Sequence, residues 1–147
     1  MDPLSIAASI TGIVSACLRA ATGLDAVRIK FKYAHLTITA LVSQCRAINA
    51  GLSRLESLLR ESRTIRDRPD LMSTFDLTLS GCHAVLFCLE STIDKLRAAD
   101  VAPGRSRIRK WRNRASIVWN EDEMKRYFVL LQGQQSAVSF LIQLLQM

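Results

Sequence analysis

The sequence predicts an all-α fold, an antiparallel four-helix bundle of long helices with a short basic helix or loop before the last helix. Apolar residues recur at alternating intervals of three and four in four long stretches, and no stretch shows the alternation of a strand. The chain is 49% hydrophobic but only 6% aromatic, which favours an interior of Leu, Ile and Ala. At 147 residues it suits one domain, so we expect a single helical-bundle domain over 1–147, the N-terminal domain of a larger protein.

The first predicted helix covers residues 3–32. Asp2 is a suitable N-cap and Pro3 suits the first helical position. Residues 3–18 contain no charged side chain. One stripe consists of Ile6, Ile10, Ile13 and Cys17, and a second stripe, of small residues, consists of Ala8, Gly12, Ala16 and Ala20. Both stripes indicate close contact with other helices.

This uncharged segment is either the central helix of the bundle or a helix that leaves it for a membrane. The residues that would face lipid in the second case are Leu4, Ile6, Ile10, Gly12, Ile13 and Val14. The acidic Asp2 at its start is atypical of a secretory signal. Fifteen helical residues rise about 22 Å, less than the roughly 30 Å of a bilayer core, so we expect that the segment does not span a membrane alone.

Two further helices are predicted at 37–62 and 70–99. A turn at 33–36 precedes the first of them, and a loop near 64–69 separates the two because Pro69 follows three charged residues. The residues expected in the core of the whole bundle are Ile10, Cys17, Leu41, Leu52, Leu79, Leu86, Leu89, Leu131 and Val138.

Pro103 and Gly104 end the third helix, and a basic patch follows. Its residues are Arg105, Arg107, Arg109, Lys110, Arg112 and Arg114. No acid lies among them, so they account for most of the net charge of +7. The patch is either a solvated connection or a surface for anionic lipid, an acidic partner or nucleic acid. Nucleic acid is the least favoured, since only two tryptophans are available for stacking.

The last predicted helix covers 120–146 and has the clearest start. Asn120 is its N-cap, Glu123 completes a capping box, and Trp119 and Met124 form a hydrophobic staple. Its predicted apolar stripe is interrupted only by the polar Gln135 and consists otherwise of Met124, Phe128, Leu131, Val138, Ile142 and Leu145. Glycines inside three of the helices, Gly51, Gly81 and Gly133, predict close helix crossings.

The sequence offers little chemistry. It contains no phosphate-binding glycine motif and no recognisable nucleophile motif, so we expect neither enzymatic activity, nor a cofactor, nor a small-molecule substrate. Consecutive acids at 121–123 are explained by the helix dipole. Cysteines at 17, 45, 82 and 88 lack metal-ligand spacing and are expected to be reduced core residues of a cytoplasmic protein.

Two segments resemble a known family. The opening MDPLSIAASITGIVS and the closing SIVWNEDEMKRYFVLLQGQQSAVSFLIQLLQ, with the leucine stripe of 41–59 between them, are similar to the N-terminal helical domains of fungal STAND (NLR-like) proteins. The family is also represented by the N-terminal domain of azaphilone pigment cluster protein L and is related to HeLo-like domains. The resemblance implies a helical bundle that serves in signalling or programmed cell death, HeLo relatives acting by delivering an N-terminal helix to membranes.

Three functions follow as hypotheses. In the first, a signalling or cell-death effector releases its N-terminal helix to a membrane and the basic patch anchors it to anionic lipid. In the second, a non-permeabilising interaction module keeps that helix buried and binds other helical proteins or itself. A nucleic-acid-binding regulator is third. Under the first hypothesis the cytoplasmic protein is peripheral at membranes.

Overall fold

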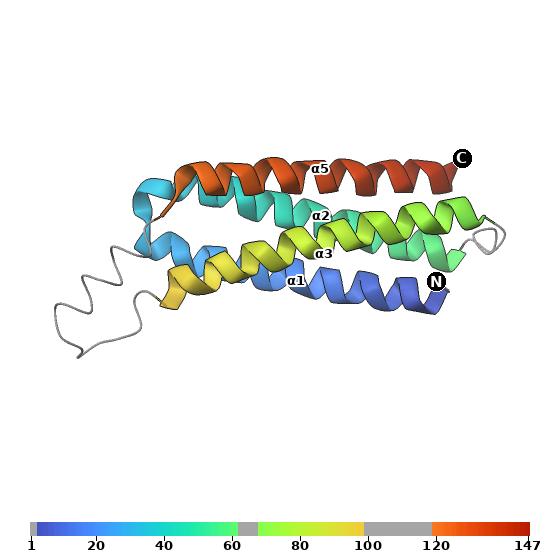
Figure 1. The fold of residues 1–147 in the computed structure, drawn as a ribbon, viewed down its shortest axis with the longest axis horizontal. Helices are drawn as coiled ribbons and strands as arrows, with labels where there is room; N and C mark the ends of the chain where they lie inside the picture. Colours follow the sequence, from blue (N-terminus) through green and yellow to red (C-terminus); the bar gives the residue numbers. More distant parts are fainter. Residues whose placement is uncertain (1–2, 62–67, 99–118) are drawn as a thin grey trace.

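The computed structural model describes residues 3–61, 68–98 and 119–147, and these ranges are helical almost throughout (Figure 1). The elements are α1 (Pro3–Lys30), the 3₁₀ turn η1 (Lys32–Ala34), α2 (His35–Glu61), α3 (Pro69–Ala98) and α5 (Glu121–Gln146). The predicted all-α bundle is therefore confirmed, with helix bounds close to those expected. The predicted basic helix or loop, like Asp2 and the loop near 64–67, lies outside the described residues.

The turn between α1 and α2 comes earlier than predicted. The backbone of Phe31 leaves the helical region, and its carbonyl accepts a hydrogen bond from the Ala34 amide at 3.0 Å. A 3₁₀ turn thus replaces the end of the expected helix 3–32, and α2 already begins at His35 instead of residue 37. Tight turns of this kind are common between helices because they use the free amides and carbonyls of the helix ends.

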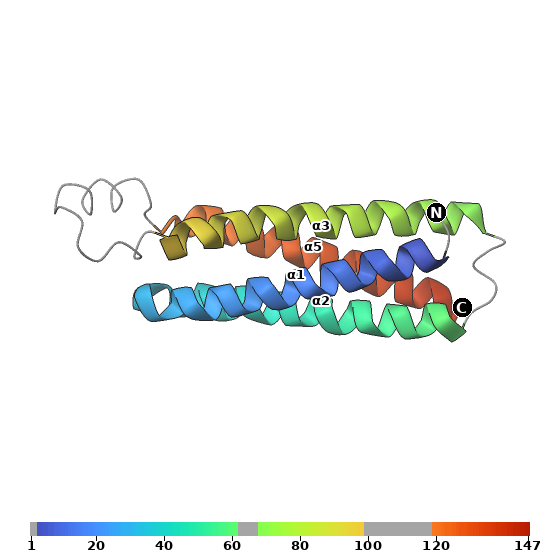
Figure 2. The ribbon, with the colours of Figure 1, turned by 90° about the horizontal axis from the view of Figure 1, so that it is seen from below.

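The four long helices form a ring in which α1 and α5 are each flanked by α2 and α3. Consecutive helices reverse direction, so α1 and α3 run the same way, as do α2 and α5 (Figures 1 and 2). The bundle is therefore antiparallel at α1/α2 and α3/α5 but parallel at α1/α3 and α2/α5. Both ends of the chain lie at one end of the bundle (Figure 2).

The apolar stripes form one core, and all nine residues predicted to be buried are buried. The core also includes side chains off the predicted stripes, namely Val42, Leu71 and Leu141. On α5 the register differs from the prediction, because Leu141 is buried while Phe128, Gln135, Ile142 and Leu145 are only partly buried.

The glycines test the prediction of close crossings. A Cβ at Gly51 would lie 3.0 Å from Val138 on α5, and one at Gly81 would lie 3.0 Å from Gln134, so both crossings are confirmed. The prediction is wrong for Gly133: no atom of the described residues outside its own helix lies within 4 Å of that Cβ position. Gly23, which the sequence analysis did not single out, makes the closest approach, 2.6 Å to Ile93 on α3.

Candidate functional site

The predicted lipid-facing residues of α1 do not share one face. Ile6, Ile10 and Ile13 are buried in the core, Val14 is half-buried against it, and Gly12 is exposed. The side chain of Leu4 lies outside the described residues. The apolar stripe of α1 is therefore already occupied by contacts with α2 and α3.

The small-residue stripe of α1 is only partly in contact. Ala16 and Ala20 are buried, whereas Ala8 and Gly12 are exposed, so the expected close contact on that side is wrong for the first half of the helix. The exposed half borders an open groove between α1 and α3 with a volume of about 650 Å³. Its walls include Asp76, His83, Phe87 and Glu90 of α3 and Arg19 of α1.

An ion pair and a ring contact lie along this groove. Arg19 Nε lies 3.3 Å from Glu90 Oε1, which links α1 to α3, and His83 stacks on Phe87 with ring centroids 6.3 Å apart. Because Arg19 is well exposed, this ion pair contributes little stability. Among the described residues no group of His, Cys, Asp and Glu could hold a metal ion.

The start of α5 confirms the predicted cap. Asn120 Oδ1 accepts a hydrogen bond from the Glu123 amide at 3.0 Å. Trp119 and Met124, the predicted staple, are both buried, and the Trp119 ring packs on Phe31 with centroids 5.6 Å apart. The Glu123 carboxylate lies 3.5 Å from Thr92 of α3. These contacts fix the start of α5 against the turn after α1 and against α3.

Glu121 connects the start of α5 to α2 and to Trp119. Its carboxylate accepts hydrogen bonds from the Thr37 hydroxyl of α2 and, at 2.6 Å, from the Trp119 indole N–H. Both bonds favour the ionised form, and the Thr37 bond is the larger cause of a lowered pKa of Glu121. From the sequence, Glu121 was expected only to interact with the helix dipole. The clamp that its hydrogen bonds form with Thr37 and Trp119 was not predicted. The presence of Trp119 two residues before Glu121 was the feature of the sequence that could have indicated this hydrogen bond.

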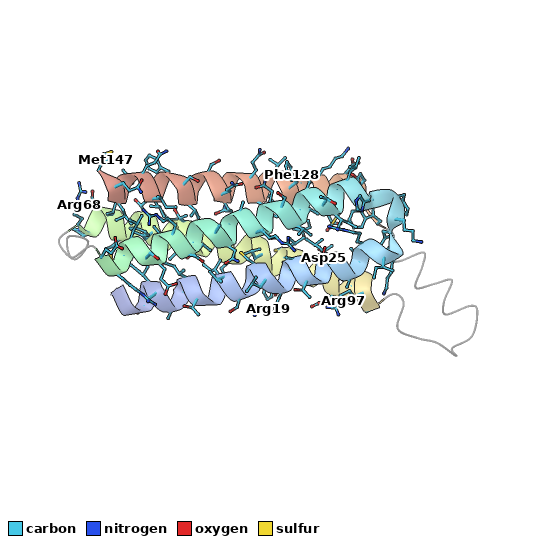
Figure 3. All side chains as sticks on the ribbon, turned by 180° about the vertical axis from the view of Figure 1, so that it is seen from behind. Arg19, Asp25, Arg68, Arg97, Phe128 and Met147 are labelled. Carbon is cyan, nitrogen blue, oxygen red and sulfur yellow. The ribbon has the colours of Figure 1, made fainter. Side chains whose placement is uncertain are left out.

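The outer face of α5 is apolar, uncharged and largely uncovered. We define it by residues that share one side of the helix: Val129, Leu130, Gly133, Ala137, Phe140 and Leu144. Val129, Leu130, Gly133 and Phe140 are exposed, and Ala137 and Leu144 are half-buried. No Asp, Glu, Lys or Arg occurs from Tyr127 to Met147. Side chains project along this outward edge of α5 between the labelled Phe128 and Met147 (Figure 3).

Exposed aliphatic and aromatic side chains in such a row usually mark a contact surface. An isolated exposed hydrophobic residue elsewhere on the bundle, such as Leu77, is ordinary by comparison. This face was not predicted from the sequence, because the prediction for this helix considered only the residues expected in the core. The uncharged run after Arg126 was the signal that could have revealed it.

Among the described residues, three helices are long and apolar enough to cross a membrane by length and composition alone. They are α1 from Ser5 to Lys30, α3 and α5. The uncharged segment alone was expected to be too short, whereas the whole of α1, which continues through Arg19 to Lys30, is long enough. Of the most apolar window, 44% is buried inside the bundle in α1 but only 17% in α5. Membrane association is thus compatible with the composition of these helices.

The basic patch at 105–114 lies outside the described residues, so its relation to the bundle stays a prediction. Comparison with known proteins found no matching family model, no similar curated protein and no similar solved structure.

Proposed function

We propose that this chain is a helical interaction module that binds helical partners, or a copy of itself, through the outer face of α5. One observation carries the proposal: the exposed, uncharged apolar face lies on α5, while the apolar stripe of α1 is enclosed in the core. Helical proteins commonly bind one another by laying apolar faces together. The resemblance to N-terminal domains of STAND proteins suggests a cytoplasmic signalling setting for such a module.

The enclosure of α1 argues against easy release. Ile6, Ile10, Leu24 and Val27 are fully buried, and each buried aliphatic side chain contributes about 1.5–3 kcal/mol relative to exposure. Withdrawing α1 would expose these residues together with their partners on α2 and α3. Four such residues together contribute about 6–12 kcal/mol, which is of the same order as the 5–15 kcal/mol net stability typical of a whole domain. A module that keeps α1 in place needs no such rearrangement.

Site-specific photo-crosslinking in cells that express the chain tests the proposal. The probe amino acid replaces Phe140 on α5 or, as a matched control, Leu18 on α1, whose exposed fractions are 53% and 52%. We expect discrete protein adducts from position 140 and few from position 18. Adducts from position 18 alone, or lipid adducts from it, would contradict an interaction face on α5.

A second candidate, favoured by the exposed uncharged side of α1, is the HeLo-like effector that delivers its N-terminal helix to a membrane. Ala8, Thr11, Gly12 and Ser15 on that side are exposed and carry no charge. Dye release from anionic liposomes distinguishes the candidates. If α1 inserts, Gly12→Asp abolishes leakage, because a charge at bilayer depth costs several kcal/mol. The open space at Gly12 should let this variant fold normally, which its thermal transition checks. If α1 stays in the core, neither protein releases dye.

A further inference from the structure

The connection between α1 and α2 carries three large apolar side chains that the bundle leaves uncovered. Ile29 lies in the last turn of α1, Tyr33 in η1 and Leu36 in the first turn of α2. Their exposed fractions are 75%, 75% and 84%, higher than those of the other large apolar residues in the described ranges except the last residue, Met147. All three lie within one helical turn of the chain reversal, at one end of the bundle. We call them the turn cluster.

The turn itself does not depend on these three side chains. Phe31 packs on Trp119 with ring centroids 5.6 Å apart, and Ala34 is buried, so these residues hold the turn against the bundle. Tyr33 only meets the Phe31 ring edge-on, at 6.1 Å between centroids. The stretch 29–36 contains no Gly, Pro, Asn, Asp or Ser, the residues that usually form connections. Exposed apolar side chains that the fold does not use indicate a contact outside the chain.

Cations surround the turn cluster. Lys30 and Lys32 alternate with its members along the chain, and both are exposed. No Asp or Glu occurs from residue 26 to residue 55. The last turn of α3 adds Lys95 and Arg97 beside the end of α1, and Lys30 Nζ donates a hydrogen bond to the Arg97 carbonyl oxygen at 3.0 Å. The cluster is thus bordered by positive charge from two helix ends and η1.

Acids are fewer on this side of the bundle end. Asp25 is paired with Arg28, whose Nη2 lies 3.2 Å from Asp25 Oδ1. Asp94 is the one acid in residues 92–98 of α3. The acids at 121–123 start α5, which lies across the ring from α1. The charge around the turn cluster therefore complements an anionic surface.

We propose that the turn cluster docks the end of the bundle on an anionic lipid bilayer, with Ile29, Tyr33 and Leu36 inserted at the level of the headgroups. Within the described part of the chain, the turn projects beyond the ends of α3 and α5, so it meets a flat surface first (Figures 1 and 2). Docking leaves α1 in the core. The inference goes beyond the proposed function and does not rest on it, because the long sides of the bundle stay accessible when its end is bound.

A bilayer suits the turn cluster better than a folded partner does. Two helix ends side by side cover about 10 Å by 20 Å, or about 200 Å². A standard protein interface buries about 800 Å² on each partner. Tyrosine is enriched at the level of lipid headgroups, because its ring is apolar and its hydroxyl is polar. Lysine can reach the headgroups with its charge while its methylene chain stays in apolar surroundings.

Cosedimentation of the full chain with vesicles tests the proposal, with phosphatidylcholine alone and with phosphatidylserine added as probes. Wild type should bind the mixed vesicles more tightly. Leu36→Asp should weaken this binding at least tenfold, because it places a charge where an apolar side chain enters the bilayer. Leu77→Asp is the matched control, with the same change at a position 74% exposed. Its charge lies about 30 Å from the end of α3, beyond the Debye length, so it should weaken binding no more than about twofold.

An environment-sensitive fluorophore locates the contact. In a Cys88→Ser background, which removes the exposed thiol, the dye is attached to His35→Cys beside Leu36 or to Ala50→Cys farther along the same helix, both at exposed positions. Mixed vesicles should shift the emission of the dye to the blue at position 35 and leave it unchanged at position 50. Circular dichroism confirms that each variant folds.

Three results would overturn the turn cluster as a docking site: no binding of wild type to the mixed vesicles, equal binding of Leu36→Asp and Leu77→Asp, or equal emission shifts at positions 35 and 50. Equal binding of the two aspartate variants would assign the attachment to charge elsewhere in the chain. The contact face on α5 is tested separately by adducts at position 140, so either proposal can fail without the other.

Discussion

The four cysteines fall into two groups according to their surroundings. Cys17, Cys45 and Cys82 are buried, and burial raises the pKa of their thiols to about 12, 12 and 11 respectively, because the thiolate is poorly solvated there. Cys88 is exposed, so its predicted place in the core was wrong. Cys17, Cys45 and Cys82 lie on the apolar stripes of their helices. Cys88 lies six residues after Cys82 and is therefore on another side of α3.

Thiol labelling should therefore be selective. A maleimide at neutral pH should modify one thiol, that of Cys88, in the folded protein and all four in denaturant, since reactivity requires access and thiolate. Mass spectrometry counts the labels. Cys88→Ser is the control and should take up none while folded. Rapid labelling of Cys17 or Cys45 in the native protein would show that the core opens readily.

The glycines of α1 should respond to alanine in opposite directions. Gly12→Ala should stabilise the fold by up to about 1 kcal/mol, because the helix gains propensity and the added Cβ meets open space. Gly23→Ala should destabilise it, because the same Cβ would lie 2.6 Å from Ile93 Cγ2. Urea denaturation of the two variants gives the comparison. Equal shifts of the midpoint would refute the close approach of α1 and α3 at Gly23.

Glu121 should make stability depend on pH in the acidic range. Its pKa is lowered in the folded state, so its stabilisation is complete above the unfolded pKa of about 4.3 and is lost as pH falls through the folded value. Wild type should thus lose stability more steeply below that pH than Glu121→Gln. Denaturation midpoints between pH 3 and pH 6 measure the difference, with Asp122→Asn in the same helical turn as control. Parallel curves for wild type and Glu121→Gln would mean that the clamp with Thr37 and Trp119 contributes nothing.

At the scale of the helix, apolar spacing predicted the elements well and their arrangement less well. The stripes of α1, α2 and α3 located the buried residues because an amphipathic helix must cover its apolar side. A stripe does not specify which helix covers it, so the parallel α1/α3 and α2/α5 pairs were not predicted. On α5 the polar Gln134 also contacts α3, because it lies 3.0 Å from the Cβ position of Gly81 and accepts a hydrogen bond from the Cys82 thiol.

The two sides of α1 should differ in their contribution to stability. Ile10→Ala should lower the free energy of unfolding by about 2–5 kcal/mol, as expected for a fully buried isoleucine, and Leu18→Ala by no more than about 0.5 kcal/mol. Chemical denaturation measures both. Small effects for both substitutions would indicate that α1 is loosely held and ready to leave the bundle, contrary to its enclosure by α2 and α3.

Across the whole molecule, α1 is packed against α2 and α3, and α5 carries the exposed apolar face that we propose as a contact surface. The fold class was predictable because each long helix carries an apolar stripe and the first and last helices also carry a start signal. The exposed face of α5 was not predicted, because the functional hypothesis was based on the uncharged N-terminal helix. In the structure most large apolar residues of α1 are buried in the core, whereas Val129, Leu130 and Phe140 of α5 are exposed.

Amide hydrogen exchange along the chain, at low and high protein concentration and with anionic vesicles, tests this division of roles most directly. Amides of α1 from Ile6 to Val27 should exchange only through global unfolding under all three conditions, because the helix is packed on two neighbours. Amides of α5 around Gly133 should gain protection as concentration rises. Faster exchange in α1 than in α2 and α3, altered further by vesicles while α5 is unchanged, would contradict the account.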